Sequence, residues 1–141
     1  MASMSVAQTR VDWVSAGGTH RGNVRPINQD ALLNRPDIGL WAVADGMGGH
    51  ASGERASALV VEQLSKLPRP RFLGRSARQV ECLLSDANRR LVDEAEASGE
   101  AVIGTTVVIL LAVGRSCVLM WVGDSRIYRL RADKLQQLTT D

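Results

Sequence analysis

An apolar stretch that ends in an aspartate and a run of glycines constrains this chain more than any other segment. Residues 41–50 read WAVADGMGGH, so Asp45 follows a strand-like apolar run and Gly46 follows Asp45 directly. Glycine allows backbone conformations and close approaches that a side chain would prevent. A carboxylate beside a freed backbone carbonyl supplies the oxygen ligands that Mg²⁺ or Mn²⁺ prefers. Taken alone, an Asp-Gly pair is more often a plain turn.

The order of the predicted elements favours an α+β fold. Hydrophobic periodicity predicts strands first, then two helices, then further strands, with the strands over residues 8–16, 30–34, 39–44, 102–113, 117–122, 127–130 and 134–138. Elements grouped in this way favour a layered fold in which the helices cover one outer sheet face and the central strands pack sheet on sheet. The strands over 102–113 and 117–122 lack polar alternation, so both of their faces should be covered.

The two helices are predicted from apolar residues that recur at helical spacing over residues 56–67 and 80–91. Pro68 should end the first helix, because proline cannot continue it. Ser76 and Gln79 are spaced as a capping box at the start of the second helix, and Gly99 should end it. Three tryptophans in strand patterns are expected in the core, namely Trp13, Trp41 and Trp121.

Composition places the chain among ordinary globular proteins. Its 141 residues are 45% hydrophobic and 23% charged, which suits one domain with a core of useful size. The net charge of +2 is too small to indicate nucleic acid or a membrane surface as a partner. Cys82 and Cys117 lie in apolar patterns and are expected to be buried and reduced. With a polar first ten residues and no signal peptide in view, a cytoplasmic location is expected.

Acidic residues stand at the ends of three predicted strands. Asp30 follows Arg25 at a spacing of five residues, Asp45 precedes Gly46, and Asp124 follows a glycine. Desolvating such acids is costly unless they are paired or bind a metal. The planar fork of an arginine suits a phosphate group, because it donates two parallel hydrogen bonds. Jointly, these residues predict a metal cluster that faces an anion.

Four motifs in this order resemble those of the bacterial PP2C-type (PPM) metal-dependent protein serine/threonine phosphatases. They are residues 22–30 (GNVRPINQD), 42–50 (AVADGMGGH), 104–106 (GTT) and 122–126 (VGDSR). Residues 87–89 (ANR) and 138–141 (LTTD) are similar to that family as well. The resemblance extends from about Val11 to Asp141, and it implies a β-sandwich flanked by helices with a metal centre at one edge.

The resemblance implies a role for each matching residue. In the family, the aspartate matching Asp45 bridges two divalent cations, Mn²⁺ or Mg²⁺, and the carbonyl matching Gly46 adds a ligand. The arginine matching Arg25 binds the substrate phosphate. Asp30 is similar to a carboxylate that orients water at the metals, and Asp124 resembles the ligand of an additional, weaker metal site.

Two residues depart from the family pattern. Family members often carry glutamate where this chain has Gln29, and a neutral amide binds a metal more weakly, so this candidate ligand is expected to be looser or more hydrated. Some members carry a histidine that serves as general acid where this chain has Met47. That role is not transferred to His50, which is interpreted as a loop or capping residue. The general acid therefore stays unassigned.

The resemblance stops at the last residue, whereas family catalytic domains continue through further strands and two more aspartate ligands. We therefore expect residues 1–141 to be the N-terminal part of a single PP2C-like domain, incomplete on its C-terminal side. The expected function is metal-dependent hydrolysis of phosphoserine and phosphothreonine. The expected substrate is a phosphorylated protein, the product of a serine/threonine kinase. The alternative is a non-catalytic module that binds a phosphoprotein or a partner half-domain. A purely structural metal-binding domain is less favoured, because it leaves Arg25 unexplained.

Unpaired strand edges and exposed apolar surface favour self-association. A chain that contains only the first half of a sandwich should leave both. We therefore expect the folded chain to be an oligomer with little phosphatase activity alone.

Overall fold

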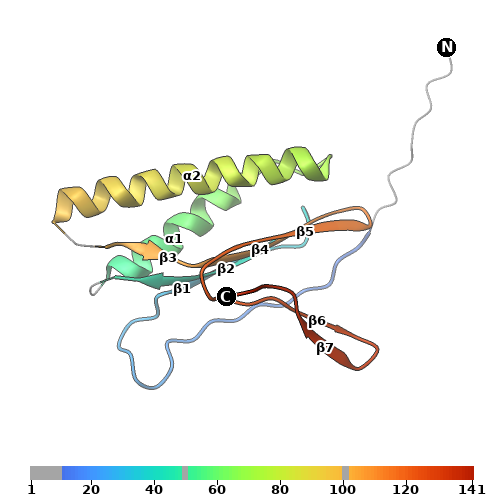
Figure 1. Cartoon of the computed structure of the whole chain (residues 1–141), viewed down its shortest axis with the longest axis horizontal. Helices are drawn as coiled ribbons and strands as arrows, with labels where there is room; N and C mark the ends of the chain where they lie inside the picture. Colours follow the sequence, from blue (N-terminus) through green and yellow to red (C-terminus); the bar gives the residue numbers. More distant parts are fainter. Residues whose placement is uncertain (1–10, 49–50, 100–101) are drawn as a thin grey trace, which may run out of the picture.

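An antiparallel sheet with the strand path β1-β2-β4-β5, to which β3 adds at one end of β2, forms the centre of this computed structural model (Figure 1). The structure describes residues 11–48, 51–99 and 102–141. The sheet contains β1 (Asp30–Arg35), β2 (Leu40–Met47), β3 (Gly104–Thr105), β4 (Val107–Val113) and β5 (Ser116–Val122). Two helices, α1 (Ser52–Ser65) and α2 (Leu73–Ser98), lie between β2 and β3 in the chain, and β6 (Tyr128–Arg131) pairs with β7 (Lys134–Gln137) in a separate hairpin. The predicted α+β fold is confirmed.

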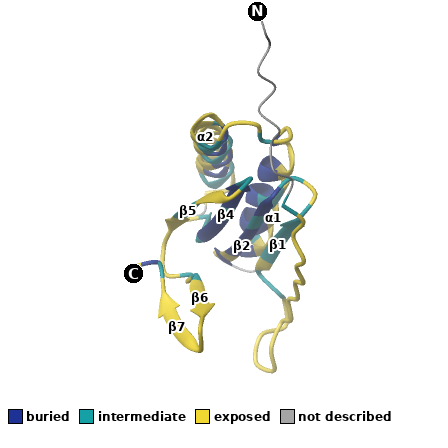
Figure 2. Ribbon diagram, turned by 90° about the vertical axis from the view of Figure 1, so that its right-hand side faces the viewer, coloured by how far each residue is buried: buried dark blue, intermediate teal, exposed yellow. Residues whose placement is uncertain are grey.

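The helices cover one face of the sheet, and β2 shows which face this is. Every second residue of β2 is buried, namely Leu40, Ala42, Ala44 and Gly46. Successive side chains of a strand point to opposite faces. The apolar members of this set share one hydrophobic core with Leu59 of α1 and Ile109 of β4. Figure 2 shows the buried residues between the helices and the sheet. Asp45 therefore lies on the face that the helices leave uncovered.

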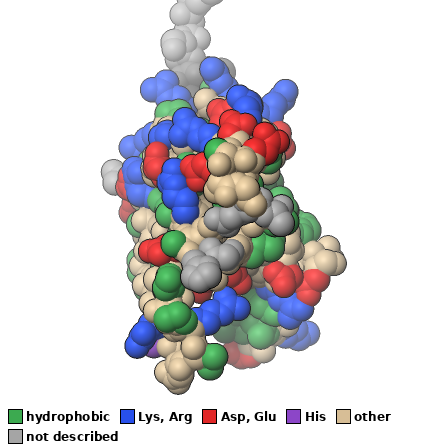
Figure 3. All heavy atoms as spheres, turned by 90° about the vertical axis from the view of Figure 1, so that its left-hand side faces the viewer, with side chains coloured by type: hydrophobic (Ala, Val, Ile, Leu, Met, Phe, Trp, Pro, Cys, Tyr) green, Lys and Arg blue, Asp and Glu red, His purple; other side chains and the backbone are tan. Residues whose placement is uncertain are grey.

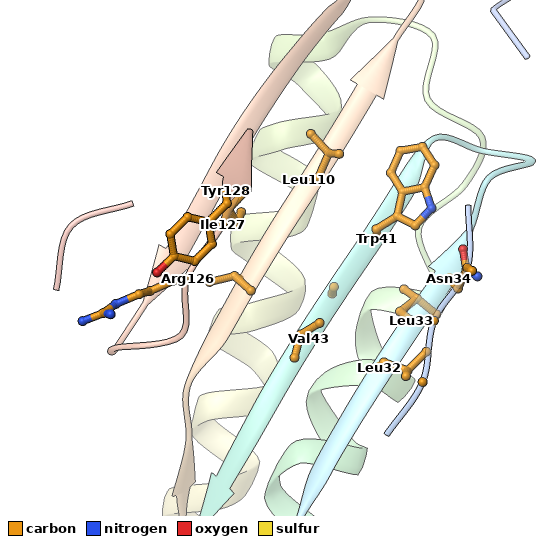
Figure 4. A pocket seen from close by; sticks show the side chains of 14 residues that line it. Leu32, Leu33, Asn34, Trp41, Val43, Leu110, Arg126, Ile127 and Tyr128 are labelled. Atoms are coloured by element: carbon orange, nitrogen blue, oxygen red, sulfur yellow. The ribbon is translucent and has the colours of Figure 1, made fainter. Parts of the chain in front are cut away.

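We call this second surface the open face and define it by Trp41 and Val43 of β2 with Val108 and Leu110 of β4. It is only partly covered, by the extended segment near Gly17 and by the segment that follows β5. A cavity of about 440 Å³ lies between these segments and the sheet, and all four residues line it (Figure 4). Trp13 packs edge-on against Trp41, with ring centroids 5.5 Å apart.

The helix ends agree with the sequence except at the start of α2. α1 ends at Ser65, ahead of Pro68, and Gly99 ends α2 in the left-handed conformation with φ of 71°. The predicted capping box is wrong, because α2 begins at Leu73, after Phe72 in extended conformation. Ser76 lies inside the first turns, where its backbone N–H donates to the carbonyl of Phe72.

Three strand predictions differ from the structure. The described part of the first predicted strand, residues 11–16, is extended chain outside both sheets, while residues 8–10 lie outside the described residues. β2 continues to Met47, so Asp45 and Gly46 lie within a strand rather than after it. The predicted strand over 102–113 is interrupted at Thr106, whose N–H donates to the carbonyl of Asp45 at 2.9 Å. The irregular bond is the one in the other direction, where the Asp45 N–H donates to the Thr106 side-chain oxygen at 3.3 Å in place of the backbone carbonyl that a regular ladder uses.

Burial is lower than the apolar patterns predict. Cys82 and Cys117 are both exposed, contrary to expectation. β5 is a sheet edge with little cover, and its ends are exposed, whereas β4 beside it is largely buried. Trp121, on β5, and Trp13, in the extended segment outside the sheets, are both exposed over more than a third of their surface. None of the helices in the described residues combines the length and apolarity that a membrane span requires.

Candidate functional site

A cleft of about 860 Å³ opens at the end of the sheet where β2 pairs with β3. It collects five of the predicted site residues, namely Arg25, Gln29, Asp45, Gly46 and Asp124. The sixth, Asp30, stands outside its lining but directly opposite Asp45 in the β1–β2 register. Figure 3 shows the molecule from this end.

The carboxyls of Asp45 and Asp30 repel each other across β1 and β2. The pKa of Asp45 is raised above its ordinary value, first because the cleft wall partly buries the carboxyl, and next because Asp30 carries like charge beside it. Asp124 raises this pKa further, whereas the positive charge of Arg25 lowers it. Asp45 is nevertheless exposed towards the cleft, so water screens these interactions and their free-energy cost is small. Three carboxylates and one arginine therefore act on one another at this point.

Two glycines let α1 approach β2 closely behind the site. A β-carbon at Gly46 would overlap the backbone carbonyl of Gly53, in the first turn of α1. A β-carbon at Gly53 would in turn lie 2.7 Å from the side-chain nitrogen of Gln29. Side chains at either position would force the helix away from the strand. Close contact of these two backbones therefore fixes the position of Gly46 beside Asp45.

Gln29 connects the predicted phosphate-binding arginine to this packed corner. Its backbone carbonyl accepts from the N–H of Gly46 at 3.0 Å, and its side-chain oxygen lies 3.5 Å from the donating Nη1 of Arg25. Its amide also lies against Gly53. Gln29 thus contacts both Arg25 and the strand of Asp45, while its predicted part as a metal ligand stays a prediction.

Asp124 is held in the cleft by a glycine turn and a hydroxyl pair. Gly123 has φ of 94°, and a β-carbon there would lie 2.7 Å from the methyl of Thr106, so both conformation and space require glycine. Ser125 Oγ lies 2.7 Å from Thr106 Oγ1. The backbone N–H of Asp45 donates to the same Thr106 oxygen at 3.3 Å. Thr106 therefore stands between Asp45 and the loop of Asp124.

The last residues of the chain form another wall of the cleft. Trp121 Nε1 donates to the carbonyl of Thr140 at 3.0 Å, and Arg126 Nε donates to Asp141 at 2.9 Å. Hydrogen bonding to Asp141 raises the pKa of Arg126, and Arg126 lowers the pKa of Asp141. The structure thus places Arg126 in an ion pair with Asp141.

Comparison with known proteins decides the family. The sequence profile of the family described as protein phosphatase 2C matches residues 16–141. The chain belongs to the protein phosphatase 2C family. Over 89% of its length it is 35% identical to the serine/threonine protein phosphatase PstP of Mycobacterium tuberculosis. It is 34% identical over 87% of its length to the serine/threonine phosphatase stp of Listeria monocytogenes.

Solved phosphatase 2C structures share this fold. PppA, described as a key regulatory component of T6SS in Pseudomonas aeruginosa, superposes with a TM-score of 0.86 at 42% identity over 88% of the chain. The catalytic domain of PstP in complex with two manganese ions gives a TM-score of 0.76 at 35% identity over 88% of the chain. The chain spans 54% of each of these two structures, 52% of stp and 24% of PstP as a whole protein.

The donors of this phosphatase 2C chain fit part of a metal centre. Asp45 and Asp124 are carboxylates that share one cleft, where a cation would offset their like charges. Carboxylate and carbonyl oxygens suit Mg²⁺ and Mn²⁺. Within the described residues, however, no three His, Cys, Asp or Glu side chains are grouped closely enough to hold an ion by themselves. The fit is therefore that of a site needing ligands from elsewhere.

Sequence reasoning did not assign Thr106, Trp121 or Thr140 to the site, although all three line the cleft. The motif at residues 104–106 did contain a signal for Thr106. It places two adjacent threonines between apolar segments, and the hydroxyl groups of these threonines need hydrogen-bond partners. His20 contributes only a local bond, in which its Nδ1 accepts from the N–H of Gly22 at 3.0 Å. His50 lies outside the described residues.

Proposed function

We propose that this chain is the N-terminal part of a metal-dependent protein phosphatase that hydrolyses phosphoserine and phosphothreonine. The observation that supports this most is the meeting of Arg25 with Asp45 and Asp124 in one cleft, since phosphoryl transfer needs both a cation for the phosphate oxygens and a metal site. The relatives named above are serine/threonine phosphatases, which supports the same reaction class.

In this proposal each residue of the site has a distinct role. Arg25 binds and orients the substrate phosphate through its planar fork, and Gln29 steadies Arg25 through the side-chain contact described above. Asp45, the Gly46 carbonyl and Asp124 contribute ligands for Mn²⁺ or Mg²⁺, with Gln29 as a further, weaker candidate. Asp30, opposite Asp45, accepts a hydrogen bond from water in the site. Cations bound there would lower the pKa of a shared water and stabilise the charge that develops on the phosphate.

The remaining ligands would come from outside this stretch. We propose that residues 1–141 are part of a single PP2C-like domain, in which later residues complete the metal set and cover the open face. A phosphorylated protein, as a serine/threonine kinase would produce it, is the proposed substrate. Its proposed location is the cytoplasm, and nucleic acid and membranes are not proposed as partners.

A non-catalytic module is the second candidate. The incomplete ligand set among the described residues favours it for the chain alone. In that case Arg25 would bind a phosphorylated partner or the chain would pair with a second half-domain, and no phosphate would be released. A phosphatase assay separates these candidates.

Release of phosphate from phosphothreonine and phosphoserine peptides should be measured with Mn²⁺ in a protein that carries this chain within a complete catalytic domain. Arg25→Ala should lower kcat/KM by about 100-fold, because the transition-state charge loses its cation. Arg25→Lys should recover only part of this loss, because lysine lacks the fork. Arg35→Ala is the matched control, since Arg35 pairs with Asp37 away from the cleft. Unchanged kinetics of Arg25→Ala would remove Arg25 from the site, and no Mn²⁺-dependent turnover would favour the binding module.

A further inference from the structure

Thr106 touches both carboxylate-bearing segments of the candidate metal centre. Towards β2, its N–H donates to the Asp45 carbonyl at 2.9 Å, and its Oγ1 accepts from the Asp45 N–H at 3.3 Å. Towards the Asp124 loop, the same Oγ1 lies 2.7 Å from Ser125 Oγ. Its methyl group faces the space that a side chain at Gly123 would need. Thr106 is therefore in contact with residues on both sides of Asp124 as well as with Asp45.

The chemistry of a hydroxyl makes this double contact possible. One hydroxyl has a single donor and two acceptor positions, so Thr106 Oγ1 can accept from Asp45 and still bond to Ser125. Valine has the same shape but neither position, and serine keeps the hydroxyl while losing the methyl. Thr106 stands between β3 and β4 and is part of the cleft lining.

We propose that the hydroxyl pair of Thr106 and Ser125 is a positioning device that fixes Asp124 relative to Asp45 for cation binding. This inference rests on the proposed function, because it assigns the two aspartates to one metal centre. Asp45 and Asp124 line the same cleft, and two carboxylates of like charge in one site repel each other. A tether that opposes this repulsion keeps the ligands close before a cation arrives, which lowers the cost of binding.

Binding of Mn²⁺ to the 141-residue chain, followed by the EPR signal of the free ion, tests the inference without an activity assay. Thr106→Val should weaken Mn²⁺ binding about tenfold. This is at the lower end of the loss in affinity that follows when a metal ligand loses a residue that positions it. Ser125→Ala should weaken it to a similar degree. The double variant should be little weaker than either single variant, because both remove one shared bond. Thr106→Ser should stay within about threefold of the unmodified chain, as the hydroxyl remains.

Thr105→Val is the matched control, because Thr105 Oγ1 donates only to the neighbouring Thr106 carbonyl. It should bind Mn²⁺ like the unmodified chain. If Thr106→Val does not fold, as judged by circular dichroism, Ser125→Ala and Thr106→Ser carry the test. Unweakened binding in Ser125→Ala, alongside lost binding in Asp45→Asn, would overturn the positioning role and leave the metal centre intact. Unweakened binding in Asp45→Asn as well would contradict the proposed metal centre itself.

Discussion

The helix-covered face and the open face of the sheet differ in what they contribute. Ile109 of β4 points into the core beneath the helices and is fully buried, whereas its neighbour Leu110 lines the half-covered cavity on the other side. The same alternation in β2 places Ala44 in the core and Asp45 in the cleft. Stability is therefore concentrated on one face and the candidate chemistry on the other, and a single strand supplies both.

This arrangement ties the site to the register of the sheet. A shift of β2 by one residue would exchange its buried and exposed sets, moving Asp45 under the helices and Ala44 into the cleft. The core under α1 therefore holds the carboxylate in place indirectly. Substitutions on the two faces should accordingly have different effects.

The largest effect is expected in the core of the covered face. Ile109→Ala should lower the free energy of unfolding by about 3 kcal/mol, because it removes buried methyl groups and leaves a cavity. Leu110→Ala, the neighbouring substitution on the open face, should cost about 1 kcal/mol, since that side chain is only partly covered. Urea denaturation monitored by circular dichroism measures both. Equal costs would show that the two faces do not differ as described.

A smaller loss is expected at the glycine contact between β2 and α1. Gly46→Ala should cost about 2 kcal/mol, because the added methyl group overlaps the carbonyl of Gly53 and backbone must move. Gly74→Ala serves as the control, as its β-carbon would meet nothing within 4 Å. It should stabilise α2 by about 0.5 kcal/mol through helix propensity. Thermal unfolding of both variants should be compared with that of the unmodified chain. A loss of stability in Gly46→Ala but not in Gly74→Ala would attribute the loss to the contact with Gly53.

The open face should also govern self-association. We predict that the isolated chain forms oligomers through this face, and that Val43→Lys weakens association about tenfold or more, because a buried charge is costly. Val92→Lys is a close match, since Val92 is 47% exposed on α2 and Val43 is 48% exposed on β2. It should leave association unchanged. Light scattering over a concentration series decides this, and a stable monomer of the unmodified chain would refute the prediction.

The smallest effect concerns the charge of Asp45. Its pKa in the folded chain lies above the ordinary value of 3.8, so the folded state favours the protonated form. Its contribution to stability is thus fully present below that value and is lost as pH rises through the folded pKa. Asp45→Asn should therefore stabilise the metal-free chain by about 0.5 kcal/mol at neutral pH, an effect kept small by solvent screening. The gain should vanish in acid.

Asp37→Asn provides the opposite sign for this comparison. Arg35 lowers the pKa of Asp37 through a hydrogen bond, so the charged carboxylate favours folding. That variant should be less stable than the unmodified chain above the ordinary pKa, and the difference should disappear as pH falls through the lowered pKa of Asp37 in the folded chain. The urea midpoints of Asp45→Asn and Asp37→Asn should be measured across the acidic range and compared with those of the unmodified chain. Stability changes of the same sign in the two variants would contradict the prediction.

The sequence predicted the order of elements, the C-terminal ends of both helices and five of the residues that meet in the cleft. The end of α2 at Gly99 and the hairpin around residues 132–133 could be predicted, because local conformation decides them. Ala132 and Asp133 both have positive φ. The start of α2 and the break at Thr106 could not be predicted in this way. The break at Thr106 involves Asp45, which is distant in the sequence, and the start of α2 has no side-chain cap that a motif could reveal.

Burial was the less predictable property. Apolar patterns indicate which residues prefer cover, but not whether cover is present within the chain. Cys117 and Trp121 lie on β5, at an edge of the sheet, and remain exposed although every residue of that strand after Ser116 is apolar. In the site, the contact between Gln29 and Gly53 joins distant parts of the sequence and left no local pattern.

Calorimetric titration of the isolated chain with Mn²⁺ tests most directly whether the open face carries part of a phosphatase metal centre. The unmodified chain should bind Mn²⁺ weakly, as part of the ligand set is absent from the described residues. Asp45→Ala should abolish the heat of binding, while Asp37→Ala, which removes an exposed aspartate outside the cleft, should preserve it. The same heat from Asp45→Ala as from the unmodified chain would contradict the assignment.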